Sequence, residues 1–156
     1  MAHILIIDDE PLMRTMLRDI FERQGHSVQE APDGRAGLAL WRQNPADVVL
    51  TDIFMPEKDG IEVILEIKRS RSETKIAVMT GGGQTRQLEM VPAAMILGAD
   101  RAIQKPFDRK AILALIGNLL GERASPDGCA TSAAKFSPCQ QEHGADKDRA
   151  TPIHSF

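Results

Sequence analysis

Three acidic side chains directly follow apolar segments that are short enough to be β-strands. Asp8 and Asp9 come after residues 3–7, and Asp52 comes after residues 47–51. Because the carboxyl ends of parallel strands meet at one edge of a sheet, we expect the three carboxylates to lie together. Carboxylates held that close repel one another and raise each other's pKa unless a cation lies among them. The sequence therefore predicts a metal site.

Carboxylate oxygens favour a hard cation such as Mg²⁺ or Ca²⁺. Mg²⁺ is commonly held by one or two carboxylates, while water molecules and a phosphate oxygen fill its remaining positions. We therefore expect a phosphoryl group beside the metal. Two residues that suit a phosphoryl group follow later short runs at corresponding ends: the Thr80 hydroxyl comes after residues 75–79, and the Lys105 ammonium comes after residues 101–104.

Short apolar segments alternate with stretches of helical period as far as residue 120. This alternation is typical of βα units built around a mainly parallel sheet, and it predicts five strands and five helices. The first helix is expected to begin near Pro11, whose fixed φ suits an opening turn. Acidic residues are expected to cap three of the helices: Asp33, Asp59 and Asp108.

Two of the expected helices differ in how clearly the sequence defines them. The third has regularly placed apolar positions: Ile61, Val63, Ile64, Leu65 and Ile67. The fourth helical stretch, from about residue 87 to residue 97, contains Pro92. Because proline lacks a backbone donor and its ring clashes with the preceding turn, we expect this helix to be short, late-starting or kinked.

The order of the candidate residues resembles the receiver domain of two-component response regulators. The resemblance covers about residues 1–121, and it is carried by Asp8-Asp9, Asp52 with Met55-Pro56 and Asp59-Gly60, Thr80, and Lys105 with Pro106-Phe107. Several such positions in one order are more specific than any single motif. The resemblance implies an α/β fold of the flavodoxin-like, doubly wound type, with a five-stranded parallel sheet in the order 2-1-3-4-5 and helices on both faces.

The resemblance also implies the chemistry. Asp52 is then the phosphoacceptor, which takes its phosphoryl group from a phosphohistidine on a sensor histidine kinase or a histidine phosphotransfer protein. Mg²⁺ is bound directly by Asp9 and Asp52, mainly through water by Asp8, and by the main-chain carbonyl of Phe54. Such a domain is a signalling protein that catalyses only its own phosphorylation and dephosphorylation.

A further implication of the resemblance is the way in which phosphorylation is sensed. Lys105 pairs with a phosphoryl oxygen, and Thr80 bonds the phosphoryl group once formed and draws the following loop inward. Many receivers carry Tyr or Phe three positions before this lysine. Ala102 stands there in this chain, so the aromatic half of the switch is missing. The Lys105–Pro106 peptide bond is expected to be cis, as it commonly is in the family.

Composition and charge argue against several other classes of protein. The 19 basic and 22 acidic residues give a formal net charge of −3, which provides no attraction to nucleic acid or to a membrane surface. No apolar stretch approaches the ~20 residues of a membrane span, and the start lacks the features of a signal peptide. We therefore expect a cytoplasmic protein in which Cys129 and Cys139 are free reduced thiols.

The chain is expected to have two regions, a receiver domain over residues 1–121 and a disordered tail over residues 122–156. The tail is rich in small and polar residues and cannot bury enough apolar surface to offset the entropy of ordering it. It has no room for a helix-turn-helix output domain. We therefore expect a single-domain response regulator that signals to an unidentified downstream protein through changed protein–protein contacts.

Apolar residues beside the expected site suggest two hypotheses. Leu12 and Met16 lie on one side of the first helix but off its core-facing stripe, which makes them a candidate docking patch for a helix of the kinase or phosphotransfer protein. Phe54 is bulky and apolar two residues after the acceptor. We expect its side chain to shield the acyl phosphate from water.

Three alternatives stay open on the sequence. A receiver can act as a phosphorelay intermediate or as a phosphate sink instead of a signal. An Mg²⁺-dependent phosphatase of the haloacid dehalogenase type also forms an aspartyl phosphate, but it uses Asp-x-Asp after its first strand, where this chain has Asp8-Asp9. A pure interaction module would have no need of the complete set of site residues.

Overall fold

The structure is a computed structural model that describes residues 1–55, 59–70, 73–81 and 85–121 of the 156. Strands and helices alternate along this part of the chain: β1 His3–Ile7, α1 Pro11–Glu22, β2 Ser27–Ala31, α2 Gly34–Gln43, β3 Val48–Asp52, α3 Gly60–Ser70, β4 Lys75–Thr80, α4 Thr85–Leu97, β5 Arg101–Gln104 and α5 Arg109–Gly121. The expected tail and both cysteines lie outside the described residues. Within the described ranges, no helix has the length and apolar character needed to cross a membrane.

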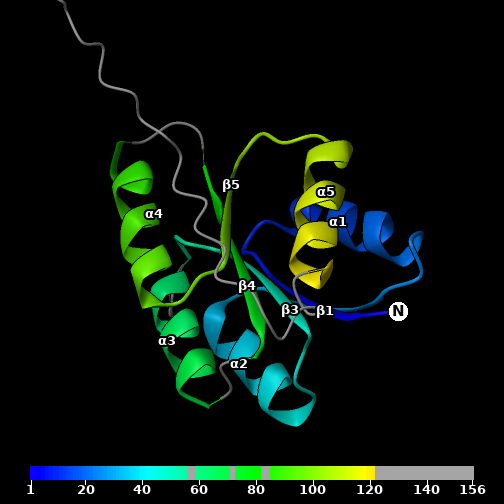
Figure 1. Ribbon diagram of the computed structural model, residues 1–156, viewed down its shortest axis with the longest axis horizontal. Helices are drawn as coiled ribbons and strands as arrows, with labels where there is room; N and C mark the ends of the chain where they lie inside the picture. The colour runs from blue at the N-terminus through cyan, green and yellow to red at the C-terminus, as the bar shows by residue number, and fades with distance from the viewer. Residues whose placement is uncertain (56–58, 71–72, 82–84, 122–156) are drawn as a thin grey trace, which may run out of the picture. The chain divides into compact units, whose positions relative to one another are not determined.

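The five strands form one parallel sheet with the order β2-β1-β3-β4-β5. Figure 1 shows α1 and α5 on one side of this sheet and α2, α3 and α4 on the other. The predicted flavodoxin-like, doubly wound fold is thereby confirmed. In such sheets ligands bind beyond the carboxyl ends of the strands where the strand order reverses, which here is the end of β1 and β3.

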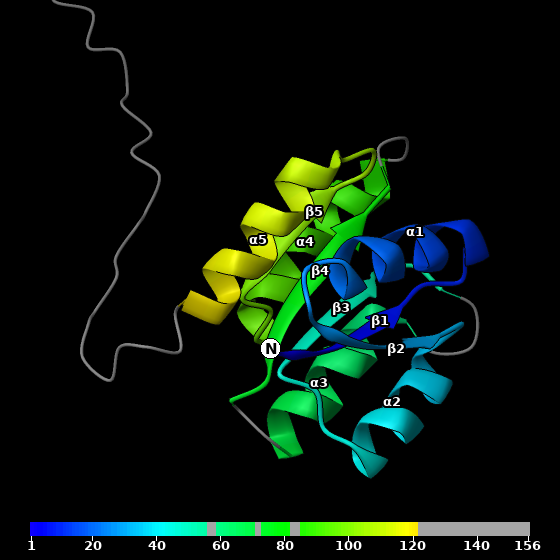
Figure 2. The ribbon, with the colours of Figure 1, turned by 90° about the vertical axis from the view of Figure 1, so that its right-hand side faces the viewer.

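Each face of the sheet has its own hydrophobic core, because side chains along a strand alternate between the two faces. Ile4 and Ile6 of β1 pack with Phe21 on the face that α1 and α5 cover. Leu5 and Ile7 pack on the opposite face, which α2, α3 and α4 cover. Figure 2 shows the sheet between these two helical layers. Since both faces are buried, the central strands are largely apolar, and polar residues at their ends stand out in the sequence.

The three predicted helix caps are confirmed. In each case a carboxylate oxygen accepts a hydrogen bond from the amide three residues further on, which satisfies a donor that the first turn of a helix leaves free. The donors are the amide of Ala36 to Asp33 at 2.8 Å, of Glu62 to Asp59 at 3.0 Å and of Ala111 to Asp108 at 2.7 Å.

The fourth helix differs from the prediction. α4 begins at Thr85, earlier than expected, and continues through Pro92 to Leu97. Pro92 is exposed, whereas Ala94 is fully buried against the sheet and Met90 and Leu97 pack on the same core. Proline removes a backbone hydrogen bond from the helix. The packing of these residues on the core stabilises the turns before and after Pro92, so the helix continues through it.

The third helix buries only part of its apolar positions. Val63, Ile64 and Ile67 are buried, but Leu65 is 37% exposed. A helix turns once in about 3.6 residues, so closely spaced apolar side chains cannot all point toward the sheet.

Candidate functional site

The predicted site residues gather at the carboxyl ends of the central strands. Asp8 directly follows β1, Asp52 is the last residue of β3 and Thr80 is the last residue of β4. β3 and β4 each end one residue later than the sequence predicts, and Asp52 pairs with Met79 in the β3–β4 ladder. Asp52 and Thr80 are therefore held by the sheet rather than by a loop, which fixes their main chains more firmly.

The three carboxylates form one cluster. Oxygen atoms of Asp8, Asp9 and Asp52 all lie within 4.8 Å of one another. Asp8 is fully buried and Asp52 nearly so, whereas Asp9 is exposed to solvent. Hard oxygen donors with one open side match what Mg²⁺ needs, because Mg²⁺ keeps several water ligands. These residues therefore fit a divalent cation.

Lys105 ties two of these carboxylates together. Its Nζ atom lies 2.7 Å from Oδ2 of Asp8 and 3.0 Å from Oδ2 of Asp52. The side chain of Lys105 is only 14% exposed, so the contacts are poorly screened by solvent. One ammonium thus balances two buried carboxylates only in part, and the cluster keeps a net negative charge that favours a further cation.

Burial and charge act against each other at this ion pair. Burial raises the pKa of the Asp52 carboxyl, and the hydrogen bond and charge of Lys105 offset part of that rise. Burial alone would lower the pKa of Lys105, but its hydrogen bonds to Asp8 and Asp52 and their charges together raise it. Lys105 is therefore protonated at neutral pH.

Main-chain amides orient the two buried carboxylates. The amide of Glu10 donates to Oδ1 of Asp8 at 2.9 Å, and the amide of Phe54 donates to Oδ1 of Asp52 at 3.1 Å. In each carboxylate the other oxygen faces Lys105. Both side chains are thus held at two points, which orders them before any ligand binds.

Thr80 and Phe54 lie at the same edge of the sheet. Thr80 is buried, and its carbonyl oxygen accepts a hydrogen bond from the amide of Lys105 at 2.7 Å. The ends of β4 and β5 are joined in this way. The Lys105–Pro106 bond is cis, as predicted. Phe54 lies two residues after the end of β3 and is 39% exposed, so an apolar side chain is partly open to solvent near this edge of the sheet.

Arg14 is a part of the site that the sequence prediction did not include. Its Nη1 atom donates to the carbonyl oxygen of Asp8 at 2.7 Å, which anchors the peptide between Asp8 and Asp9 to α1. The contact is to a main-chain atom, so no pattern of side-chain types reveals it. The position of an arginine on the second turn of the helix that follows Asp8-Asp9 was the only available signal.

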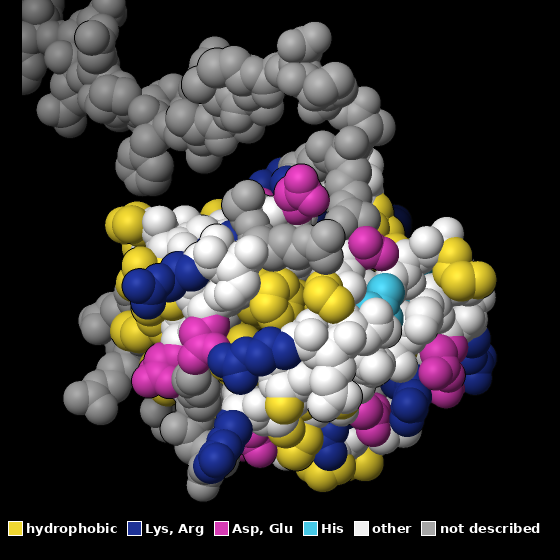
Figure 3. All heavy atoms as spheres, turned by 90° about the horizontal axis from the view of Figure 1, so that it is seen from below, with side chains coloured by type: hydrophobic (Ala, Val, Ile, Leu, Met, Phe, Trp, Pro, Cys, Tyr) yellow, Lys and Arg dark blue, Asp and Glu magenta, His cyan; other side chains and the backbone are white. Residues whose placement is uncertain are grey.

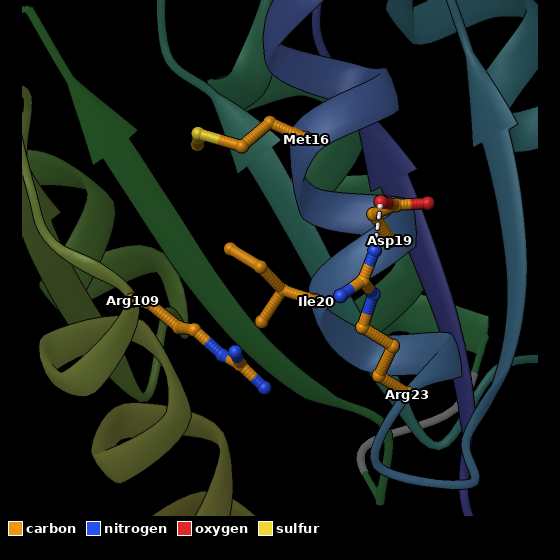
Figure 4. A pocket seen from close by; sticks show the side chains of 5 residues that line it. All are labelled: Met16, Asp19, Ile20, Arg23 and Arg109. Atoms are coloured by element: carbon orange, nitrogen blue, oxygen red, sulfur yellow. Dashed lines mark hydrogen bonds and ion pairs between the residues drawn. The ribbon is translucent and has the colours of Figure 1, made fainter.

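A pocket lies between α1 and α5, and none of the predicted site residues lines it. Figure 4 shows the residues that do: Met16, Asp19, Ile20, Arg23 and Arg109. Arg23 pairs with Asp19 at 3.1 Å on α1, whereas Arg109 extends toward the pocket from α5. The pocket therefore combines apolar surface from α1 with positive charge from α5.

The predicted docking patch of Leu12 and Met16 is exposed. Leu12 is 79% exposed and Met16 is 40% exposed, while Leu17 and Phe21 of the same helix are buried. Both residues therefore lie off the core-facing side of α1, as expected. Met16 also lines the pocket, so the patch and the pocket form a continuous surface.

Basic and acidic side chains are interspersed with apolar ones on the face shown in Figure 3. Neither sign of charge forms a continuous area among the described residues seen there. Nucleic-acid binding surfaces typically gather Lys and Arg on one face. The view in Figure 3 shows no such gathering in the described part of the chain.

Comparisons with known proteins identify the family of the chain. The sequence profile described as the response regulator receiver domain matches residues 4–117. Chemotaxis protein CheY of Bacillus subtilis is 38% identical over 122 residues, which are 77% of this chain and 99% of that protein. Response regulator MprA of Mycolicibacterium vanbaalenii is 34% identical over 133 residues, which are 85% of this chain but 56% of that longer protein.

A solved structure gives the same result. The crystal structure of a response regulator receiver domain protein from Clostridium thermocellum superposes with a TM-score of 0.73 at 30% identity, covering 79% of this chain and 97% of that one. Receiver domains of response regulators are signalling proteins of two-component systems. From its sequence and its fold, this chain belongs to the response regulator receiver domain family.

Proposed function

We propose that the chain is a single-domain response regulator that accepts a phosphoryl group on Asp52 in an Mg²⁺-dependent reaction. The observation that carries the proposal is the contact of Lys105 with Asp8 and Asp52, at 2.7 Å and 3.0 Å, beside the third carboxylate of Asp9. This is a constellation of opposite charges at the edge of the sheet where ligands bind. The donor is a phosphohistidine on a sensor histidine kinase or a histidine phosphotransfer protein.

In the proposed reaction a carboxylate oxygen of Asp52 attacks the phosphorus atom of the phosphohistidine. A P–O bond to Asp52 forms, the P–N bond to the donor imidazole breaks, and the imidazole nitrogen keeps the electron pair and is then protonated. Lys105 exchanges its contact with Asp52 for a phosphoryl oxygen. Because the reaction needs little covalent machinery, alignment and charge balance supply most of the catalysis.

The proposed metal site uses the carboxylate cluster. Asp9 and Asp52 would hold Mg²⁺ directly, Asp8 mainly through water, and the Phe54 carbonyl would complete the ligands that the protein provides. When bound, the ion neutralises charge on the phosphoryl oxygens. The close approach of three oxygen ligands, within 4.8 Å, supports this assignment.

The proposed switch is the Thr80 hydroxyl, which bonds the phosphoryl group and moves the loop after β4. Thr80 is buried at the end of β4, and its carbonyl already bonds the amide of Lys105, so the two residues respond together. Ala102 is exposed on β5 and offers no ring to follow the threonine. We therefore expect the structural change caused by phosphorylation to reach partner proteins mainly through the β4–α4 connection.

The docking patch gives a prediction about the phosphodonor. Replacing Met16 with glutamate is expected to slow transfer from the cognate kinase by about tenfold, because central interface residues typically contribute more than about 1 kcal/mol to binding. Acceptance from acetyl phosphate, which needs no docking, should be unchanged. Thr15→Glu puts the same charge on the neighbouring exposed position of α1 and serves as the control. Equal transfer to Met16→Glu and wild type would exclude the patch as the docking site.

Phe54 gives a prediction about the lifetime of the acyl phosphate. Replacing it with asparagine is expected to speed dephosphorylation several-fold, because the apolar ring no longer limits the access of water to the phosphoryl group. The decay of the phosphorylated mass peak after removal of the donor measures this rate. Ile96→Asn changes an exposed apolar residue of α4 in the same way and should leave the decay unaltered. An unchanged lifetime in Phe54→Asn would contradict the shielding role.

The experiment that tests the proposed function is intact mass spectrometry after incubation with acetyl phosphate, with and without Mg²⁺. We expect one labile phosphoryl group per chain in the presence of the metal and none after chelation. Failure to take up phosphate from either acetyl phosphate or a histidine phosphotransfer protein, with Mg²⁺ binding shown separately, would instead support a receiver fold that serves only as an interaction module.

A further inference from the structure

Gly60 is the first residue of α3, and it lies against the end of β3. A Cβ atom at residue 60 would lie 2.4 Å from the carbonyl oxygen of Asp52 and 2.9 Å from Cα of Ile53. Both are backbone atoms, and neither distance is tolerated between non-bonded atoms. Any side chain at residue 60 must therefore displace the main chain of the proposed phosphoacceptor or push α3 away from the sheet.

Hydrogen bonds hold both sides of this contact. The amide of Gly60 donates to the carbonyl of Ile53 at 2.9 Å, and the amide of Ile53 donates to the carbonyl of Met79 in β4 at 3.1 Å. The carbonyl oxygen of Asp52 also accepts a bond from the Thr51 hydroxyl at 3.0 Å. Because Ile53 is bonded to β4 on one side and to α3 on the other, α3 and β3 cannot separate without breaking hydrogen bonds.

The position of the Asp52 carboxylate depends on the position of the Asp52 main chain. Its two oxygens are held by the Phe54 amide at 3.1 Å and by Lys105 at 3.0 Å. A shift of the Asp52 backbone therefore changes the direction of the carboxylate relative to Lys105. Reactions between positioned groups are sensitive to such shifts, since a misplacement of about 1 Å can cost roughly 10²-fold in rate.

We propose that Gly60 is a positioning residue for phosphoryl acceptance. Because residue 60 has no side chain, the start of α3 can press directly on the main chain of Asp52 and hold it where its carboxylate meets the incoming phosphorus. Gly60 touches no reacting atom and acts only through Asp52. The inference rests on the proposed function, since it assigns Gly60 a part in the same reaction.

Two other glycines provide matched controls. A Cβ atom at Gly37 in α2 would lie 2.4 Å from Cδ1 of Ile7, which is the far end of a flexible side chain. Gly37→Ala therefore disturbs the core beneath the residue that precedes Asp8 without pressing on the main chain of Asp52. Gly117 in α5 has nothing within 4 Å of an added Cβ, so Gly117→Ala disturbs no neighbour.

The experiment compares phosphorylation rates of the three alanine variants with acetyl phosphate and Mg²⁺, under conditions where circular dichroism shows each to be fully folded. Gly60→Ala is expected to react about tenfold or more slowly than wild type, and both controls within about twofold of it. Urea unfolding gives the stability of each variant. The amide resonance of Phe54, which reports on the Asp52 carboxylate, should shift in Gly60→Ala and stay in place in Gly37→Ala.

Several outcomes would overturn the proposal. One is a phosphorylation rate of Gly60→Ala within about twofold of the wild-type rate. Another is a loss of rate in Gly37→Ala that is as large as the loss in Gly60→Ala for the same loss of stability. If Gly60→Ala does not fold alone, the comparison is repeated in the Gly117→Ala background, where alanine favours the helix. If Gly60→Ala also fails to fold in the Gly117→Ala background, while Gly37→Ala folds, Gly60 is needed for folding and its role in positioning Asp52 is rejected. A wild-type chain that accepts no phosphate would instead refute the proposed function, which separates the two failures.

Discussion

Replacement of Asp52 by asparagine is expected to abolish phosphoryl acceptance while leaving the protein folded. The amide has nearly the shape of the carboxylate and still accepts the hydrogen bond from the Phe54 amide, but it is not a nucleophile toward phosphorus. The variant loses one ion pair with Lys105, yet it also loses a buried charge that burial disfavours, so we expect its free energy of unfolding to stay within about 1 kcal/mol of wild type. Intact mass and urea unfolding measure the two effects.

Asp33→Asn is the matched control for this variant. Asp33 caps α2 through the amide of Ala36, and asparagine is an equally good capping residue. The control should therefore take up one phosphoryl group as wild type does. Uptake of phosphate by Asp52→Asn at the wild-type rate would show that another residue is the acceptor, and the assigned chemistry would be wrong.

Replacement of Lys105 by methionine is expected to destabilise the protein in the absence of Mg²⁺ by about 3 kcal/mol, because it leaves two buried carboxylates side by side without their cation. Asp8 is fully buried and Asp52 nearly so, which means that solvent cannot replace the missing charge. Mg²⁺ should restore stability more strongly in this variant than in wild type, since the ion enters a more negative cluster. Urea unfolding with and without the ion checks both parts.

Lys68→Met is the control for the metal effect. Lys68 lies 3.0 Å from Asp100, and both side chains are about as poorly exposed as the pair at the site, at 18% and 19%. Its loss should also destabilise the protein, but Mg²⁺ should give this variant no more stability than it gives wild type. If Mg²⁺ raised the free energy of unfolding of the two lysine variants equally, the ion would not bind at the carboxylate cluster, and the proposed metal site would be wrong.

The parts of the site that the sequence predicts are those that depend on side-chain type and on strand ends. Asp8 and Lys105 each directly follow a strand and Asp52 is the last residue of one, and a parallel sheet brings the carboxyl ends of its strands to one edge. The structure accordingly places Lys105 within 3.0 Å of both carboxylates, although residues 8 and 105 are far apart in the chain. The sheet order 2-1-3-4-5 was implied by the resemblance to receiver domains, and the structure has that order.

The parts that the sequence does not predict depend on main-chain contacts. Arg14 donates to a carbonyl oxygen, a contact that no pattern of side-chain types reveals. Gly60 belongs to the Asp59-Gly60 part of the receiver motif, but its close approach to the main chain of Asp52 is seen only in the structure. The start of α4 was also mispredicted: the helix begins at Thr85 and includes Pro92, as expected, and the burial of Ala94 and its neighbours offsets the local cost of proline. The extent of α4 is set by its packing against the sheet, and the energy of that packing cannot be predicted from the sequence of the helix alone.

The proposed function requires that Asp52 is the residue that carries the phosphoryl group. Borohydride reduces an aspartyl phosphate to homoserine, and tandem mass spectrometry of peptides then identifies the modified position. After incubation with acetyl phosphate and Mg²⁺, we expect homoserine at position 52 alone, and none when the metal is chelated. Homoserine at position 8 or 9, phosphate on a histidine, or modification that is independent of Mg²⁺ would contradict the proposed role of Asp52.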